Sequence, residues 1–123
     1  MKKIYYLKTC DTCKRILKQI KGVISEEEYN NFTFQEIKTQ KITVTQLDEM
    51  YYLTKSYEAL FNRRAKKYKQ MDLKNQILTE KDYKQLILEE YTFLKRPVII
   101  FETNIFVGNS KKEVEKIVAF LER

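Results

Sequence analysis

Two kinds of hydrophobic pattern alternate in the first third of the chain. Residues 3–7 combine aliphatic and aromatic side chains as buried strands do, and residues 32–37 alternate apolar with polar side chains. Between them, residues 11–21 place their apolar side chains on one helical face, and we expect Gly22 to end that helix. A strand, a helix and a second strand joined by a short crossover predict that the two strands are parallel.

The pattern becomes helical in the middle of the chain and returns to strands near its end. From about residue 43 to residue 90, apolar side chains recur at helical spacing, and Thr79 is one of several hydroxyl residues suited to cap a helix. Residues 97–101 and 104–108 are typical of a hairpin, and Ser110 would cap a final amphipathic helix through a capping box with Glu113. The order β-α-β, helices, β-β-α predicts an α/β fold: a thioredoxin-like mixed β-sheet with a central helical insertion.

Length and composition agree with a single domain over residues 1–123, with the helical insertion or subdomain at about 43–90. Hydrophobic residues make up 43% of the chain and aromatic residues 13%, which excludes intrinsic disorder. No apolar run approaches the ~20 residues of a membrane span, and the first residues lack the pattern of a signal peptide. We therefore expect a cytoplasmic protein that does not associate with membranes.

The strongest chemical signal is Cys10-Asp11-Thr12-Cys13, between the first predicted strand and the first predicted helix, in a chain with no other cysteine and no histidine. A thiol in the first turn of a helix faces unpaired backbone N–H groups and the positive end of the helix dipole, and both favour the thiolate. We expect Cys10 to be the nucleophile, with added positive potential from Lys8, and Cys13, one helical turn later, to be the resolving thiol.

Other interpretations of the cysteine pair carry less weight. A structural disulfide across so short a loop would constrain the unfolded chain little. A structural zinc ion usually takes four Cys or His ligands, and this chain can supply two, so we predict no metal site. The absence of histidine excludes a Cys-His hydrolase, and the absence of a glycine-rich phosphate loop disfavours a nucleotide enzyme.

Positive charge is the second chemical signal. The chain has 24 Lys and Arg against 17 Asp and Glu, a formal net charge of +7, which suits an anionic substrate, nucleic acid or an acidic protein. Residues 63–69 hold five cations, which could form an oxyanion or phosphate cradle, a nucleic-acid surface or simply a solvated face. No recognised nucleic-acid motif accompanies them, so we predict no direct binding to nucleic acid.

Arg96-Pro97 opens the third predicted strand. Proline is tolerated there because it donates no ladder hydrogen bond, and a thioredoxin-like fold commonly has a cis proline beside its two cysteines. A cis bond would turn Arg96 toward the thiol, where its planar guanidinium could hold an oxyanion through two hydrogen bonds. The alternative is a plain strand-initiating proline with Arg96 in solvent.

Four motifs follow one another along nearly the whole chain: Cys10 to Cys13, Asn62-x-Arg64 with Tyr68 and Lys69, Arg96-Pro97, and Val107-Gly108 ahead of Glu113. Together they resemble the arsenate reductase/Spx family of thioredoxin-like proteins. The resemblance implies that Cys10 is the family's nucleophile and that Arg64 and Arg96 surround a bound oxyanion.

The same resemblance implies a mechanism in which the Cys10 thiolate attacks arsenate, or another small oxyanion or disulfide substrate. Arg64 and Arg96 would lower the pKa of the thiol and neutralise charge on the oxygens. We also expect Lys8, Thr12 and Pro97 to contact the substrate. No cofactor would be bound, and an external thiol donor, glutathione with glutaredoxin or thioredoxin, would act as the redox partner, although Cys13 could resolve the adduct.

Three departures from the reductases point to an alternative. Cys13 stands where those enzymes usually have a small hydroxyl residue, their third arginine is missing near Asn109, and residues 107–110 look closer to the Spx branch. Spx proteins use the two cysteines as a disulfide switch and bind the C-terminal domain of the RNA polymerase α subunit. Yet residues 54–57 replace the glycine found at their polymerase-contacting surface. The alternative function is therefore an Spx-like redox-switched transcription regulator.

Overall fold

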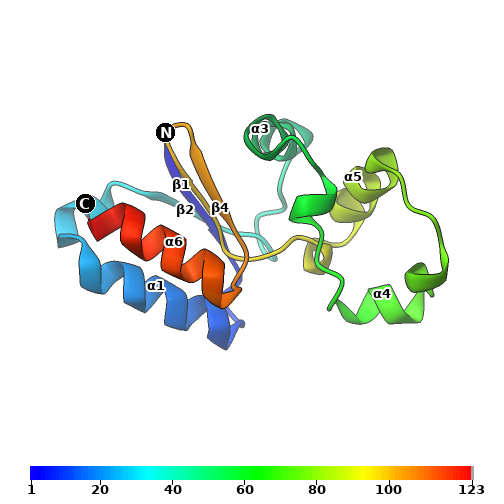
Figure 1. Ribbon diagram of the computed structural model, residues 1–123, viewed down its shortest axis with the longest axis horizontal. Helices are drawn as coiled ribbons and strands as arrows, with labels where there is room; N and C mark the ends of the chain where they lie inside the picture. Colours follow the sequence, from blue (N-terminus) through cyan, green and yellow to red (C-terminus); the bar gives the residue numbers. More distant parts are fainter. Residues whose placement is uncertain (123) are drawn as a thin grey trace. The chain divides into compact units, whose positions relative to one another are not determined.

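The computed structural model describes residues 1–122, and its chain forms two compact units (Figure 1). The first unit contains residues 1–40 and the C-terminal part of the chain from Arg96 onward, and the second contains Lys41–Lys95. Within the described residues, no helix is both long enough and apolar enough to cross a membrane.

A four-stranded mixed sheet in the order β2-β1-β3-β4 forms the first unit's centre. The strands are β1 (Lys2–Tyr6), β2 (Thr33–Glu36), β3 (Val98–Phe101) and β4 (Asn104–Val107). β1 pairs in parallel with β2, while β3 runs antiparallel to both β1 and β4. The predicted parallel crossover and C-terminal hairpin are confirmed, and the sheet is that of the expected thioredoxin-like fold.

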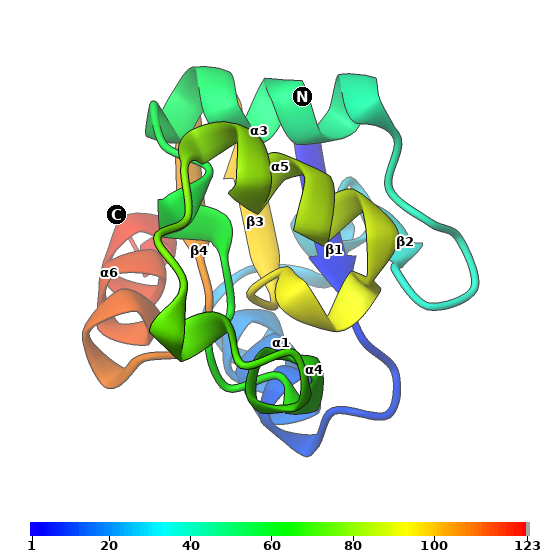
Figure 2. The same cartoon turned by 90° about the vertical axis from the view of Figure 1, so that its right-hand side faces the viewer.

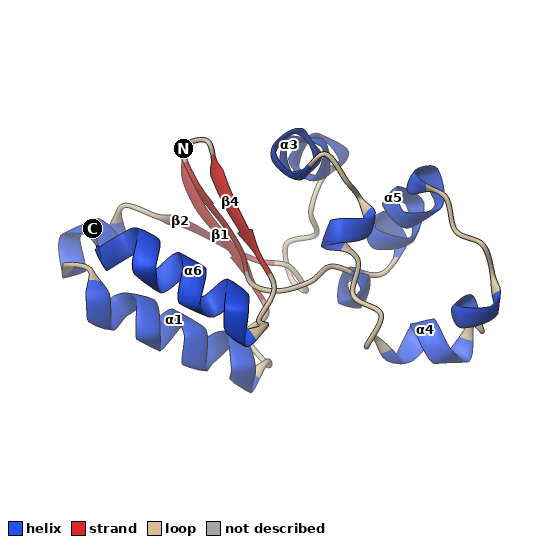
Figure 3. Ribbon diagram, in the orientation of Figure 1, coloured by secondary structure: helices blue, strands red, loops and turns tan. Residues whose placement is uncertain are grey.

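Two long helices cover one face of this sheet and lie side by side (Figures 1 and 3). The helices of the unit are α1 (Asp11–Val23), the short α2 (Glu26–Asn30) and α6 (Lys111–Glu122). Apolar side chains of α1 and α6 meet those of the strands in a common core, whose buried members are Ile4, Ile16, Ile20, Phe32, Ile99, Phe106, Ile117 and Leu121. This core holds the end of β1 and the start of α1 in place, and the loop that carries Cys10 connects them.

Two predicted helix signals differ from the structure. Gly22 does not end α1, which continues to Val23, because Val23 and Ile24 pack against the core and offset the ~1 kcal/mol cost of a helical glycine. The N–H of Glu113 donates to Ser110 Oγ at 3.1 Å as expected. The Glu113 carboxylate, however, accepts the N–H of Val107 at 2.8 Å and so joins α6 to β4.

Helices and short 3-10 turns make up the second unit (Figure 2). They are α3 (Val44–Thr54), η1 (Glu58–Leu60), α4 (Lys66–Gln70), η2 (Leu73–Asn75), α5 (Glu80–Glu89) and η3 (Tyr91–Phe93). Capping boxes at Thr43 and Thr79 begin α3 and α5. The cap at Thr79 is the predicted one. Phe61 lies at the centre of the unit's aromatic core, with its ring 4.9 Å from those of Tyr83 and Phe93.

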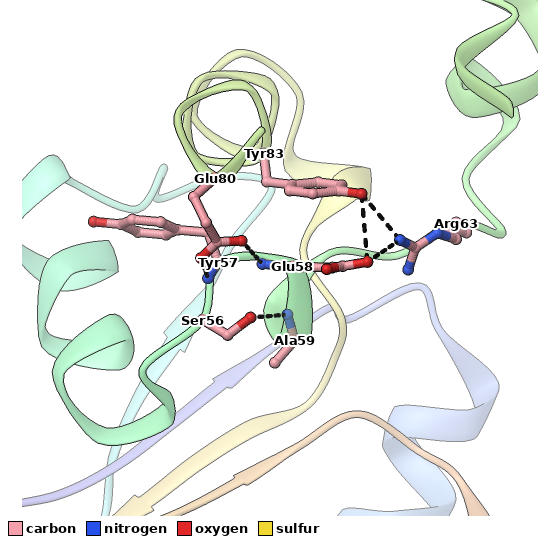
Figure 4. Close-up of polar contacts among 7 residues, drawn as sticks. All are labelled: Ser56, Tyr57, Glu58, Ala59, Arg63, Glu80 and Tyr83. Atoms are coloured by element: carbon pink, nitrogen blue, oxygen red, sulfur yellow. Dashed lines mark hydrogen bonds and ion pairs between the residues drawn. The ribbon is translucent and has the colours of Figure 1, made fainter. Parts of the chain in front are cut away.

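A polar network joins the start of α5 to η1 (Figure 4). The Glu80 carboxylate accepts the backbone N–H groups of Tyr57 at 2.6 Å and Glu58 at 3.1 Å. Arg63 Nη2 lies 2.6 Å from Glu58 Oε2 and donates to Tyr83 Oη at 3.0 Å. The first cation of the basic run 63–69 therefore has a structural role within this unit.

Candidate active site

Cys10 is the N-cap residue of α1, at the helix start that the sequence predicted. Its Sγ accepts the backbone N–H of Cys13 at 3.5 Å, and its carbonyl accepts the N–H of Lys14 at 3.1 Å. A thiol in this position lies at the positive end of the helix dipole and beside otherwise unpaired N–H groups. Cys10 is half-buried, so its sulfur retains access to solvent, whereas Cys13 is fully buried, and both are free thiols.

The two thiols differ strongly in acidity. Burial raises the pKa of Cys10, but hydrogen bonds from the backbone and side chain of Cys13 and from Arg96, with the charge of Arg96, together lower it below its ordinary value. Burial raises the pKa of Cys13 to about 12, and negative charge on Cys10 adds to that shift. The pair therefore has one acidic, accessible sulfur and one that stays protonated.

Arg96 lies close enough to Cys10 for its side chain and its charge to lower the pKa of that thiol. The Arg96-Pro97 peptide bond is cis. The side-chain amide of Asn109 donates to the Arg96 carbonyl at 3.3 Å, and the N–H of Gly108 donates to the Pro97 carbonyl at 2.9 Å. Gly108 has a φ of 86°, a conformation that favours glycine. The turn at Gly108 and Asn109 therefore fixes the backbone of Arg96 and Pro97 through these two hydrogen bonds.

Three further predicted site residues belong to the first unit. Lys8 is exposed in the loop before it, Thr12 is half-buried in the first turn of α1, and Pro97 is buried beside Arg96. Within residues 1–122, no cluster of three or more Cys, Asp or Glu side chains is arranged to hold a metal ion.

Arg64 belongs to the second unit, and its approach to the thiol stays a prediction. Its side chain is exposed, and its backbone N–H donates to Asn62 Oδ1 at 3.1 Å. Asn62 in turn donates from Nδ2 to the Thr92 carbonyl at 3.1 Å. The Asn-x-Arg motif thus has a local physical basis, because the asparagine holds the backbone that carries the arginine.

Sequence reasoning missed Glu36, at the end of β2. One carboxylate oxygen accepts the N–H of Lys8 at 2.9 Å, and the other accepts the N–H groups of Lys38 and Thr39 and the Thr39 hydroxyl at 2.8–3.0 Å. Glu36 therefore joins the end of β2 to the loop that leads to Cys10. Parallel strands end at the same sheet edge, so an acidic residue closing the second strand was the available signal.

We expect Glu36→Gln to accelerate hydrogen exchange of the Lys8 amide by about tenfold, the loss of roughly 1.4 kcal/mol of local hydrogen bonding. Glutamine has one acceptor oxygen, and its amide nitrogen cannot accept the Lys8 N–H. Exchange rates measured by NMR test this, with Thr39→Val as control because it removes a bond to the other carboxylate oxygen. Equal Lys8 protection in Glu36→Gln and wild type would contradict the assignment.

Alkylation at neutral pH should modify Cys10 and spare Cys13. Thiolates react and thiols do not, so lowering the pKa of Cys10 moves the midpoint of its rate–pH profile below that of an unfolded cysteine. Reaction with iodoacetamide at several pH values, followed by peptide mass mapping, measures both rates. In the denatured control both cysteines should react with similar midpoints. A native Cys10 midpoint at or above the denatured value would refute the proposed acidity.

Comparisons with known proteins show the family to which the chain belongs. Residues 5–117 match the model of the ArsC family. The chain is 22% identical over 114 residues to the global transcriptional regulator Spx 2 of Bacillus anthracis, covering 92% of this chain and 83% of that protein.

Solved structures establish the fold. The YFFB (PA3664) protein superposes with a TM-score of 0.76 at 20% identity, covering 98% of this chain and 99% of that one. Arsenate reductase from Vibrio cholerae gives a TM-score of 0.74 at 16% identity, covering 94% and 96%. Because the family match extends over most of the sequence, the chain belongs to the ArsC family.

Proposed function

We propose that the protein is a thiol-dependent oxidoreductase in which the Cys10 thiolate attacks a small oxyanion or a disulfide. The difference between the two thiols carries this proposal: Cys10 is accessible and acidified beside Arg96, whereas Cys13 is buried and protonated. Membership of the ArsC family and an Spx relative support the broader class of thiol-dependent oxidoreductase or Spx-like regulator.

With arsenate as substrate, Cys10 Sγ would form a bond to arsenic while one arsenate oxygen takes up protons and leaves as water. A second thiol then loses its proton and attacks Cys10 Sγ. The sulfur–arsenic bond breaks, its electron pair stays on arsenic, and arsenite leaves. Two thiols are thereby oxidised to a disulfide, and As(V) is reduced to As(III).

Cys13 is the resolving thiol that the geometry favours. Its high pKa protects it before reaction, but negative charge on Cys10 is one cause of that pKa. Once Cys10 carries an adduct, this charge is gone and Cys13 loses its proton more easily. Glutathione with glutaredoxin, or thioredoxin, would then reduce the Cys10–Cys13 disulfide.

Arg96 would neutralise the charge that develops on the substrate oxygens, since its guanidinium already helps to lower the pKa of the attacking thiol. We assign the same task to Arg64 by its place in the Asn-x-Arg motif. Lys8, Thr12 and Pro97 would contact the substrate beside Cys10.

A coupled assay tests the function. Reduced protein is offered arsenate or a small aromatic disulfide, with glutaredoxin and glutathione in one series and thioredoxin in the other. We expect arsenite, or the released aromatic thiol, to form at a rate proportional to protein. Turnover of both substrates no greater than that of the Cys10→Ser variant would overturn the proposal.

The second candidate is an Spx-like redox-switched regulator, favoured by the likeness to the Bacillus anthracis regulator over 92% of this chain. In this case the Cys10–Cys13 pair would act as a switch without turnover, and the partner would be the C-terminal domain of the RNA polymerase α subunit. Titration calorimetry with reduced and oxidised protein tests it. A 1:1 complex whose affinity depends on the redox state of the protein supports the regulator function. The absence of binding heat with both the reduced and the oxidised protein would rule that function out.

A further inference from the structure

We propose that one face of α1 docks an acidic redox protein, which delivers electrons to the Cys10–Cys13 disulfide; the inference rests on the proposed function. This basic α1 face consists of Lys14, Lys18 and Lys21, which are all exposed. Their spacing of four and three residues places them on one side of the helix. Lys14 lies one turn beyond Cys10, so the face leads directly away from the reactive sulfur.

No ion pair among the described residues 1–122 neutralises the charge of this face. The ion pairs among residues 1–122 join Lys84, Lys116, Arg63 and the N-terminus to carboxylates, and none uses a lysine of the basic α1 face. Lys21 instead lies over the Tyr29 ring, 5.6 Å from its centroid. Three cations without a carboxylate partner on one helix face offer an attractive potential to an anionic surface.

The size and position of the face favour a protein over smaller anions. Lys21 lies seven positions after Lys14, about 10 Å along the helix axis, which is longer than a small oxyanion can span. The face also begins one helical turn from Cys10, so a protein dithiol docked there would bring its own sulfur to Cys10. Nucleic acid would match the charge but carries no reductant. The net charge of +7 further disfavours a basic partner.

The docked step balances as a dithiol–disulfide exchange. One thiolate of the partner attacks Cys10 Sγ, forms a mixed disulfide and releases Cys13, which takes up a proton. The second partner thiol loses its proton and attacks the partner's own sulfur in that mixed disulfide. Cys10 leaves as the thiolate, the partner keeps the new disulfide, and two electrons have passed to this protein.

The test uses the oxidised full-length protein and measures how fast its Cys10–Cys13 disulfide is reduced, by acid quenching and mass spectrometry. The reductants are thioredoxin, glutaredoxin and, as a small neutral reagent, dithiothreitol. The test variant is Lys18→Glu/Lys21→Glu, which leaves Lys14 beside the thiol unchanged. The matched control, Lys74→Glu/Lys81→Glu, alters two exposed lysines of the second unit and lowers the net charge equally, from +7 to +3.

We expect the test variant to slow reduction by at least one of the two proteins fivefold or more at low salt, with less than a twofold change for dithiothreitol. The reduction rate of the control variant should fall less than twofold. In 0.5 M NaCl the difference in reduction rate between wild type and test variant should become smaller, because salt screens exposed charges. Because no oxyanion is used, the outcome is independent of the turnover assay.

Three outcomes would overturn the docking proposal. They are equal losses in both variants, a matching loss with dithiothreitol, or unchanged reduction by both proteins. Loss of binding to a single-stranded oligonucleotide with unchanged reduction rates would assign the face to nucleic acid, which also overturns it.

Discussion

Cys10→Ser should lower kcat/KM for the proposed reaction by at least ~10³-fold, to the background of the reductant alone. A serine hydroxyl keeps its proton at neutral pH, so neither the Cys13 N–H nor Arg96 has an anion to stabilise there. Arsenite release, or thiol release from a disulfide substrate, measures the effect. Turnover within tenfold of wild type would show that another group is the nucleophile.

Cys13→Ser is the matched control for that experiment, because it removes the other sulfur of the pair by the same chemical change. We expect the first attack to survive and the Cys10 adduct to accumulate, since the buried thiol that would resolve it is gone. Mass spectrometry of a disulfide substrate reaction should show one substrate thiol attached at Cys10. Rapid turnover without that adduct would show that an external thiol resolves it.

Arg96→Ala should lower kcat/KM about 10²-fold and raise the pKa of Cys10. Both effects share one cause, because the Arg96 hydrogen bond and charge are among the interactions that lower this pKa. Arg96→Lys should recover part of the pKa shift through its charge but little of the rate, because an ammonium group cannot offer two parallel hydrogen bonds to an oxyanion.

Alkylation of Cys10 across pH gives its pKa in each variant, and the coupled assay gives kcat/KM. Arg15→Ala is the matched control, an exposed arginine on α1, and should leave both quantities nearly unchanged. The expected direction of the pKa change is upward, so without Arg96 the reactive Cys10 thiolate forms at higher pH. A Cys10 pKa unaltered in Arg96→Ala would refute the role of the guanidinium.

Local sequence signals predicted much of this protein. Short apolar or alternating runs marked the four strands, and Thr79 marked a helix start, because capping depends on neighbours three residues away. The same locality placed Cys10 at the start of α1. These features are determined by residues close together in the chain, where spacing alone fixes which groups meet.

The tertiary structure decided the features that depend on residues far apart in sequence. Glycine at position 22 has poor helix propensity, yet α1 passes through it because the partly buried Val23 packs against the core. Glu36 contacts Lys8 from 28 residues away, and Asn109 contacts Arg96 only because β4 returns beside β3. Sequence alone supplied the reactive sulfur and its helix, whereas the packing of strands and turns supplied the guanidinium beside that sulfur and the hydrogen bonds that hold it.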